Sequence, residues 1–91
     1  LSGDTARAAE LVKSVPETKT RKIGMAWLMG KSRSRGAVNF LLNLLEDYDP
    51  DVRASAIGAL GKFRRRQLIN TLGRFVFDPN ERVRAAAVNS I

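Results

Sequence analysis

Two short runs of basic residues contain the side chains that are best suited to bind a ligand. An arginine guanidinium presents a planar fork of N–H donors that matches a phosphate or a carboxylate. The first run begins at Lys31 and the second at Lys62, and arginine outnumbers lysine in the second. Together the runs predict a surface that binds an anionic group or partner. We call them the basic cluster, which consists of Lys31, Arg33, Arg35, Lys62, Arg64, Arg65 and Arg66.

The basic cluster leaves several partners open. The chain has 16 Lys and Arg against 9 Asp and Glu, a formal net charge of +7, and no acid stands between residues 17 and 46 or between 51 and 78. A solvated surface, the phosphate backbone of a nucleic acid, and an acidic protein or lipid surface all fit this pattern. A nucleic acid would be bound with a steep dependence on salt, because its counterions are released.

The sequence argues against catalysis and against a bound cofactor. It contains no His and no Cys, the commonest general base and the commonest metal ligands. The glycines at 58 and 61 lack the spacing of a phosphate-binding loop. We therefore predict no catalytic, metal-binding or cofactor-binding residue and no enzyme activity. With no apolar run long enough for a membrane span and no signal pattern, a cytoplasmic location is expected.

The elements that position these residues follow from a repeat. The segments 47–57 and 78–88 carry nearly the same phrase, in which Val52 of the first corresponds to Val83 of the second. A fixed period of about 31 residues is typical of stacked helical repeats. Asp49 and Asn80 are good N-cap residues, so each phrase is expected to open a helix. Gly61 is expected to end the first of these helices in a left-handed conformation.

Apolar spacing predicts a second helix in each unit, over 37–45 and 68–76, with Ile69 among its inward residues. In the earlier unit a 32-residue step matches Thr20 and Arg21 with Val52 and Arg53. Together, the repeated phrase and the helix pairs predict one solenoid segment, which is expected to be a fragment of a longer array. Its parts are the second helix of an earlier repeat at 1–16, whole repeats at 17–46 and 47–77, and the first helix of another at 78–91.

The run from Asp47 to Gly61 resembles a HEAT repeat, and its period of about 31 residues resembles the short HEAT-like type of phycobilisome lyases. The resemblance implies an all-α solenoid of antiparallel helix pairs, wound into a right-handed superhelix. It also implies a non-catalytic scaffold that binds protein partners. Nucleic-acid binding through the basic edge and an accessory module of a larger enzyme remain alternatives. Self-association through exposed end repeats is a further expectation.

The same resemblance implies a structural ladder in which arginines of the first helices bond to turn residues of neighbouring repeats. Trp27 is expected to pack in the core against the earlier half-repeat, with base stacking or partner anchoring as the alternative. The predicted ladder consists of Arg21, Arg53, Arg84, Asp47, Asp49, Asp78 and Asn80.

Overall fold

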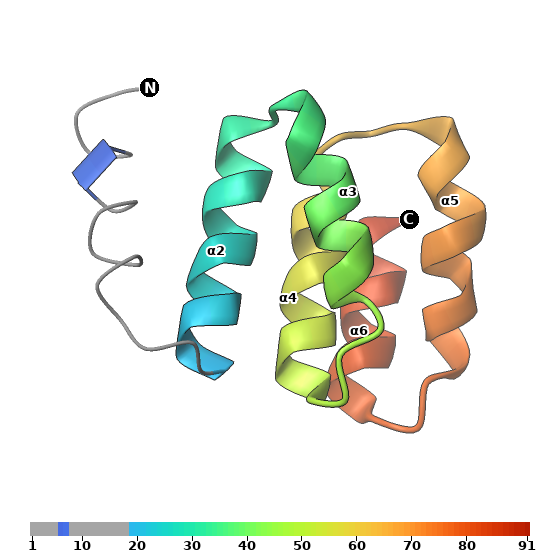
Figure 1. Cartoon of the computed structure of the whole chain (residues 1–91). Helices are drawn as coiled ribbons and strands as arrows, with labels where there is room; N and C mark the ends of the chain where they lie inside the picture. The colour runs from blue at the N-terminus through green and yellow to red at the C-terminus, as the bar shows by residue number, and fades with distance from the viewer. Residues whose placement is uncertain (1–5, 8–18) are drawn as a thin grey trace.

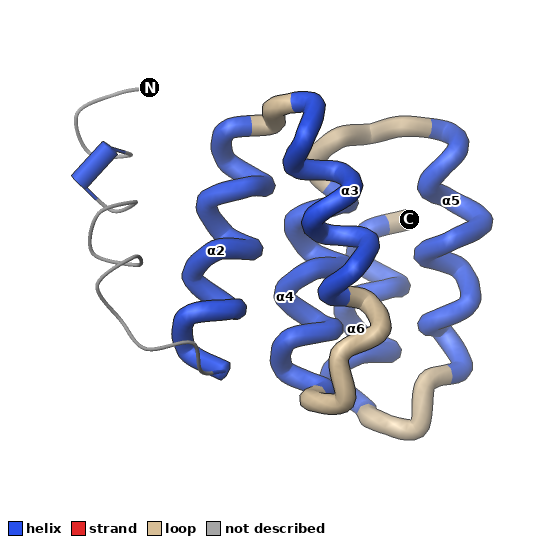
Figure 2. The backbone as a smooth tube through the Cα atoms, in the orientation of Figure 1, coloured by secondary structure: helices blue, strands red, loops and turns tan. Residues whose placement is uncertain are grey.

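The computed structural model describes residues 6–7 and 19–91, and this part of the chain contains helices, turns and loops but no strand (Figure 2). The all-α prediction is therefore confirmed. The helix predicted for residues 1–16 lies outside the described residues, apart from 6–7. The elements in chain order are α2 (Lys19–Ser32), α3 (Arg35–Leu44), α4 (Pro50–Gly61), α5 (Arg66–Gly73), the 3₁₀ helix η1 (Arg74–Phe77) and α6 (Glu81–Ser90).

The helices form two layers (Figure 1). The first helices of the units, α2, α4 and α6, pack side by side in that order. Helix α3 packs against α2 and α4, while α5 with η1 packs against α4 and α6. Among the described helices, α3 and α5 do not pack on each other. The short turns from α2 to α3 and from α4 to α5 consequently lie at one edge of the stack, and the turns that enter α4 and α6 lie at the other (Figure 1).

Aliphatic side chains at repeat-equivalent positions form the core between the layers. Ile57 and Leu60 of α4 are fully buried. Their equivalents one unit later, Val88 and Ile91, are 63% and 61% exposed. The predicted self-association stays a prediction, and these are the side chains through which it would act. The other large, fully buried residues are Leu41, Leu45, Val52 and Val83.

The predicted starts of the repeat helices are confirmed. Asp49 caps α4 by accepting a hydrogen bond from the Asp51 backbone N–H, and Pro50 follows at the first helical position. Asn80 caps α6 by accepting from the backbone N–H groups of residues 82 and 83. Each cap satisfies donors that have no partner inside the helix. The phrase repeated in the sequence is therefore a helix-start signal in both places.

The 32-residue step used to align the first unit is wrong, because the structure keeps one spacing throughout. Helices α2, α4 and α6 begin at positions 19, 50 and 81, and α3 and α5 begin at positions 35 and 66. A Cβ on Gly30 would lie 2.9 Å from the Ala59 Cβ, and a Cβ on Gly61 would lie 2.8 Å from the Ser90 Cβ. These close approaches of neighbouring helices set the 31-residue register. The 32-residue step rests only on the similar residue types of Thr20 and Arg21 and of Val52 and Arg53.

The role predicted for Gly61 is also wrong. No described glycine has a positive φ, and Gly61 is the last helical residue of α4. A glycine stands there because α6 approaches so closely that a methyl group would collide with Ser90. The left-handed residue of this turn comes three positions later, at Arg64.

Candidate functional site

The basic cluster lies at one edge of the stack, which we call the basic edge. Lys31 and Arg33 occupy the end of α2 and the turn to α3, while Lys62 to Arg66 occupy the turn from α4 to α5. All of these side chains are exposed except that of Phe63, which is half-buried. The last turn of α6 reaches the same edge (Figure 1). Equivalent turns of two successive repeats are thereby brought together.

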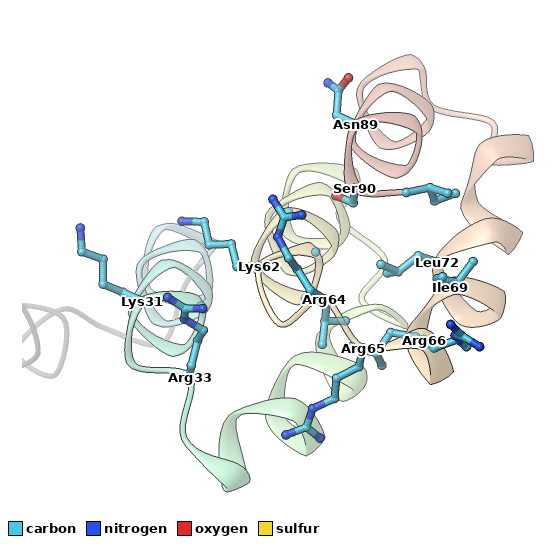
Figure 3. A pocket seen from close by; sticks show the side chains of 16 residues that line it. Lys31, Arg33, Lys62, Arg64, Arg65, Arg66, Ile69, Leu72, Asn89 and Ser90 are labelled. Carbon is cyan, nitrogen blue, oxygen red and sulfur yellow. The ribbon is translucent and has the colours of Figure 1, made fainter.

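Between these turns the surface is hollowed by a pocket of about 840 Å³ (Figure 3). The C-terminal ends of α2, α4 and α6 and the first turns of α5 enclose it. No Asp or Glu is found among its lining residues in the described part of the chain. Arg35, the remaining member of the basic cluster, does not line it. The cations that do are Lys31, Arg33, Lys62, Arg64, Arg65 and Arg66.

The wall of the hollow is aliphatic where it meets α5 and the end of α6. Ile69 was predicted to face inward, but 47% of its surface is exposed because it lies on the wall of the hollow. Leu72 lies beside it (Figure 3), and the exposed Ile91 also lines the space. Asn89 and Ser90 complete the lining from α6. None of these residues was singled out from the sequence as part of a site, since only the three-dimensional approach of α6 to α5 assembles them.

Arg33 and Arg64, at equivalent places in the two turns, share an unusual backbone. Their φ angles are 51° and 50°, in the left-handed region that normally favours glycine. An L-residue with a side chain costs roughly 1 kcal/mol or more in this conformation. Both turns thus hold an arginine where glycine would fit with less strain. Both side chains line the hollow.

Two aromatic rings accompany the cations of the basic edge. The Arg65 guanidinium lies 5.8 Å from the centre of the Phe63 ring. The Lys31 Nζ lies 5.3 Å from the centre of the Trp27 ring, a distance typical of cation–π contact. The Trp27 side chain is 49% exposed, and its packing in the core against the earlier half-repeat stays a prediction. The half-repeat on which it was expected to pack lies outside the described residues.

The opposite edge carries hydrogen bonds from the ladder arginines, both within a repeat and between repeats. The Arg53 Nη1 donates to the carbonyl oxygens of Asp47 at 2.8 Å and Tyr48 at 2.9 Å. The Arg84 Nη1 repeats this pattern with the carbonyl oxygens of Asp78 at 2.8 Å and residue 79 at 3.0 Å. The Arg53 Nη2 also reaches the Asp78 Oδ1 at 3.3 Å, which ties α4 to the turn before α6. We call this edge the ladder edge.

The ladder differs from its prediction in three respects. The Nη1 bonds of Arg53 and Arg84 stay within their own repeats, whereas bonds to neighbouring repeats were predicted. Lys22, not Arg21, stands in the position of Arg53, and its Nζ donates to the Asp47 Oδ2 at 2.7 Å. This follows from the register of the structure, which moves the equivalence by one residue. In addition, Asp49 and Asn80 accept no bond from a ladder arginine, since their side chains are used as N-caps.

Most acids on the ladder edge are paired with cations. The Asp51 carboxylate bridges two helices, because it contacts Lys19 of α2 and the Arg82 Nη1 of α6, the latter at 2.6 Å. Asp47 and Asp78 are paired with Lys22 and Arg53. The cations that have no acid nearby therefore lie on the basic edge.

These pairs make the stability of the fold depend on pH. The hydrogen bond from Lys22, followed by that from the Asp49 backbone N–H, lowers the pKa of Asp47. Lys19 likewise lowers the pKa of Asp51 through a side-chain hydrogen bond. A carboxylate with a lowered folded-state pKa stabilises the fold above its unfolded value of about 3.9, and the contribution is lost as pH falls through the folded value.

We accordingly expect the melting temperature to be nearly constant between about pH 7 and pH 5 and to fall below about pH 4. The Asp47→Asn variant can still accept the Asp49 N–H but cannot form the ion pair. It should melt at a lower temperature at neutral pH and lose less stability on acidification. Thermal denaturation followed by circular dichroism measures both. An equally steep acid loss in wild type and variant would show that the Asp47 pair does not contribute.

Other functional sites are not suggested by the described residues. In 6–7 and 19–91, no three Asp, Glu, His or Cys side chains come together in a way that could hold a metal ion. None of the helices there is long and apolar enough to span a membrane.

Comparison with known proteins places this architecture in a family. A family model described as HEAT repeats matches residues 38–91, which include α4, α5 and α6 and most of α3. The match is to HEAT repeats in general and does not distinguish the short type. No curated protein and no solved structure matches the chain. HEAT repeats generally act as scaffolds for protein interaction and are typically not catalytic. With more than half of its length matched and the helix pairs stacked as described, the chain belongs to the HEAT repeat family.

Proposed function

We propose that this HEAT segment is a non-catalytic scaffold that docks a protein partner by holding an acidic segment of that partner in the hollow of the basic edge. The observation that carries the proposal is the lining of the hollow, where six cations meet and no acid accompanies them in the described part of the chain. Carboxylates of a partner would supply the missing charge, and four of the six cations are arginines suited to two-pronged contacts.

A polypeptide fits the hollow better than a nucleic acid does. The exposed aliphatic side chains of Ile69 and Ile91 stand among the cations. Apolar side chains of a peptide can cover them, and burial of such surface contributes about 25 cal/mol per Å². A sugar-phosphate backbone offers no comparable apolar group. Nucleic-acid binding through the same cations is therefore treated as an outcome of the test.

The proposal is tested by titrating the chain with a fluorescein-labelled polyglutamate peptide and, in parallel, with single-stranded and duplex DNA. The combined change of Arg64, Arg65 and Arg66 to Ala should weaken binding of the peptide about 100-fold, since each charge-assisted contact is worth roughly 1 kcal/mol or more. Fluorescence anisotropy at about 50 mM and about 200 mM salt gives the affinities.

A matched control separates the site from the net charge. Changing Lys19, Arg74 and Arg82 to Ala removes three cations from the ladder edge, where the side chains are at least half exposed. This variant should bind the peptide about as well as wild type. Equal losses in both triple variants would mean that only overall charge matters and would contradict a docking site. Tighter binding of DNA than of the peptide, lost in the arginine variant, would favour the nucleic-acid alternative.

A further inference from the structure

A second, smaller cavity of about 270 Å³ lies between α2 and α4, next to the hollow. Trp27 and Ile23 of α2 form one wall, and Ser55, Gly58 and Ala59 of α4 form the other. The Ser55 hydroxyl is already bonded to the Asp51 carbonyl oxygen at 2.9 Å, so it offers no free donor. We call this cavity the Trp27 slot. Its surface is largely apolar, and it opens between two packed helices.

The slot and the hollow adjoin each other. Gly58 and Lys62 line both of them. Lys31 connects them as well, because it lines the hollow while its Nζ lies over the Trp27 ring at 5.3 Å. A ligand extending from the hollow into the slot would therefore pass two lysines at the junction. An acidic group at this point would be paired, and its neighbour could enter the slot.

Gly58 independently supports the idea that a ligand enters the slot. It stands in the interior of α4, where glycine costs about 1 kcal/mol relative to alanine. Gly30 and Gly61 have a reason in packing, since a methyl group on either would collide with the adjacent helix. A Cβ on Gly58 would meet nothing within 4 Å. The missing methyl group serves no contact within the described protein, and its effect is to keep the floor of the slot open.

We propose that the Trp27 slot is a second subsite of the docking surface and receives one apolar side chain of the partner, placed beside the acidic residues held in the hollow. This rests on the proposed function and specifies the partner as an acidic segment interrupted by a large aliphatic or aromatic residue. The aromatic ring provides apolar contact area, the bare backbone of Gly58 allows a close approach, and Lys31 and Lys62 hold the flanking carboxylates.

The experiment compares two unlabelled peptides, polyglutamate and the same peptide with one central leucine. Trp27 is the only tryptophan of the chain, so the tryptophan emission comes from a residue that lines the slot. The leucine peptide should shift the Trp27 emission to shorter wavelength, protect it from acrylamide quenching, and bind about fivefold more tightly by calorimetry. Polyglutamate should bind without this protection.

Two glycine variants supply the decisive control. Gly58→Ala should raise the melting temperature, because alanine favours the helix, and yet reduce the advantage of the leucine peptide, because its methyl group narrows the floor of the slot. Gly36→Ala in α3 also meets nothing within 4 Å and lies outside both cavities. It should raise the melting temperature while keeping the advantage. A loss of binding in a more stable protein cannot be attributed to misfolding.

The outcomes separate the two proposals. If both peptides bind equally and Trp27 emission does not change, the slot is no subsite, although the docking hollow stands. If neither peptide binds, the proposed function itself fails. If the leucine advantage survives in full in Gly58→Ala but disappears in Ile69→Ser, the side chain binds the wall of the hollow and the slot proposal is overturned. Protection of Trp27 by oligothymidylate but not by the leucine peptide would identify a nucleobase as the occupant and would equally overturn it.

Discussion

The Gly30→Ala and Gly61→Ala variants are expected to lose stability, whereas Gly58→Ala in the same helix as Gly61 should gain it. A methyl group on Gly61 would lie 2.8 Å from the Ser90 Cβ and 3.2 Å from its Cα. On Gly30 it would lie 2.9 Å from the Ala59 Cβ and 3.0 Å from its Cα. Such overpacking costs about 1–3 kcal/mol, of which the better helix propensity of alanine returns about 1 kcal/mol.

The net loss for Gly30→Ala should be about 2 kcal/mol. The new methyl group would collide with the Cα of Ala59 as well as its Cβ, and a backbone atom cannot rotate aside. Urea denaturation of the variants provides the free energies of unfolding. Coupling can be shown directly, since adding Ser90→Gly to Gly61→Ala makes room for the methyl group and should restore part of the loss. A stability gain in all the alanine variants would show that the helices separate readily and that the glycines do not set their spacing.

Replacing the two left-handed arginines with glycine is expected to stabilise the protein while weakening its binding to acidic peptides. Glycine adopts the left-handed φ found at Arg33 and Arg64 without steric strain. The double variant Arg33→Gly with Arg64→Gly should unfold with a free energy higher by about 1 kcal/mol. Its affinity for polyglutamate should fall about tenfold or more, because two cations leave the hollow.

Arg65→Gly is the matched control for this pair. Arg65 lines the same hollow but has a φ of −95°, which is ordinary for an L-residue. Its replacement removes a charge without relieving strain, so both affinity and stability should decrease. Calorimetric melting and peptide titration measure the two quantities together. If Arg33→Gly with Arg64→Gly lowers the melting temperature as Arg65→Gly does, the left-handed backbone stores no strain and the interpretation is wrong.

The local signals in the sequence were enough to predict that helices fill the part of the chain that the structure describes. The repeated phrase, the caps at Asp49 and Asn80 and the apolar spacing identify the helix pairs and their family. These features depend on neighbouring residues, so one sequence contains them. The register of the first unit was missed, because Thr20 and Arg21 resemble Val52 and Arg53 by type. The close contact of Gly30 with Ala59 that decides it joins two helices and cannot be read along the chain.

Of the candidate site, the sequence predicted only the cluster of positive charge. Segregation of bases into the corresponding turns of two successive units indicated the basic edge, since equivalent turns of a repeat meet at one edge. The aliphatic wall and the slot were not predicted. Ile69 follows the apolar pattern of a buried residue, and its exposure depends on how α5 packs against α4 and α6. The exposure of Trp27 and the open floor at Gly58 likewise follow from the packing of α2 on α4.

The pairing of acids on the ladder edge affects how quickly a partner can arrive. Because Asp47, Asp51 and Asp78 are paired with cations of neighbouring repeats, the charge of the ladder edge is largely neutralised, while the positive charge of the basic edge is not. An acidic partner diffusing nearby is turned toward the basic edge before contact, and this raises the rate of productive encounters. Salt would slow the approach far more than it would hasten departure, which depends on the short-range contacts already made.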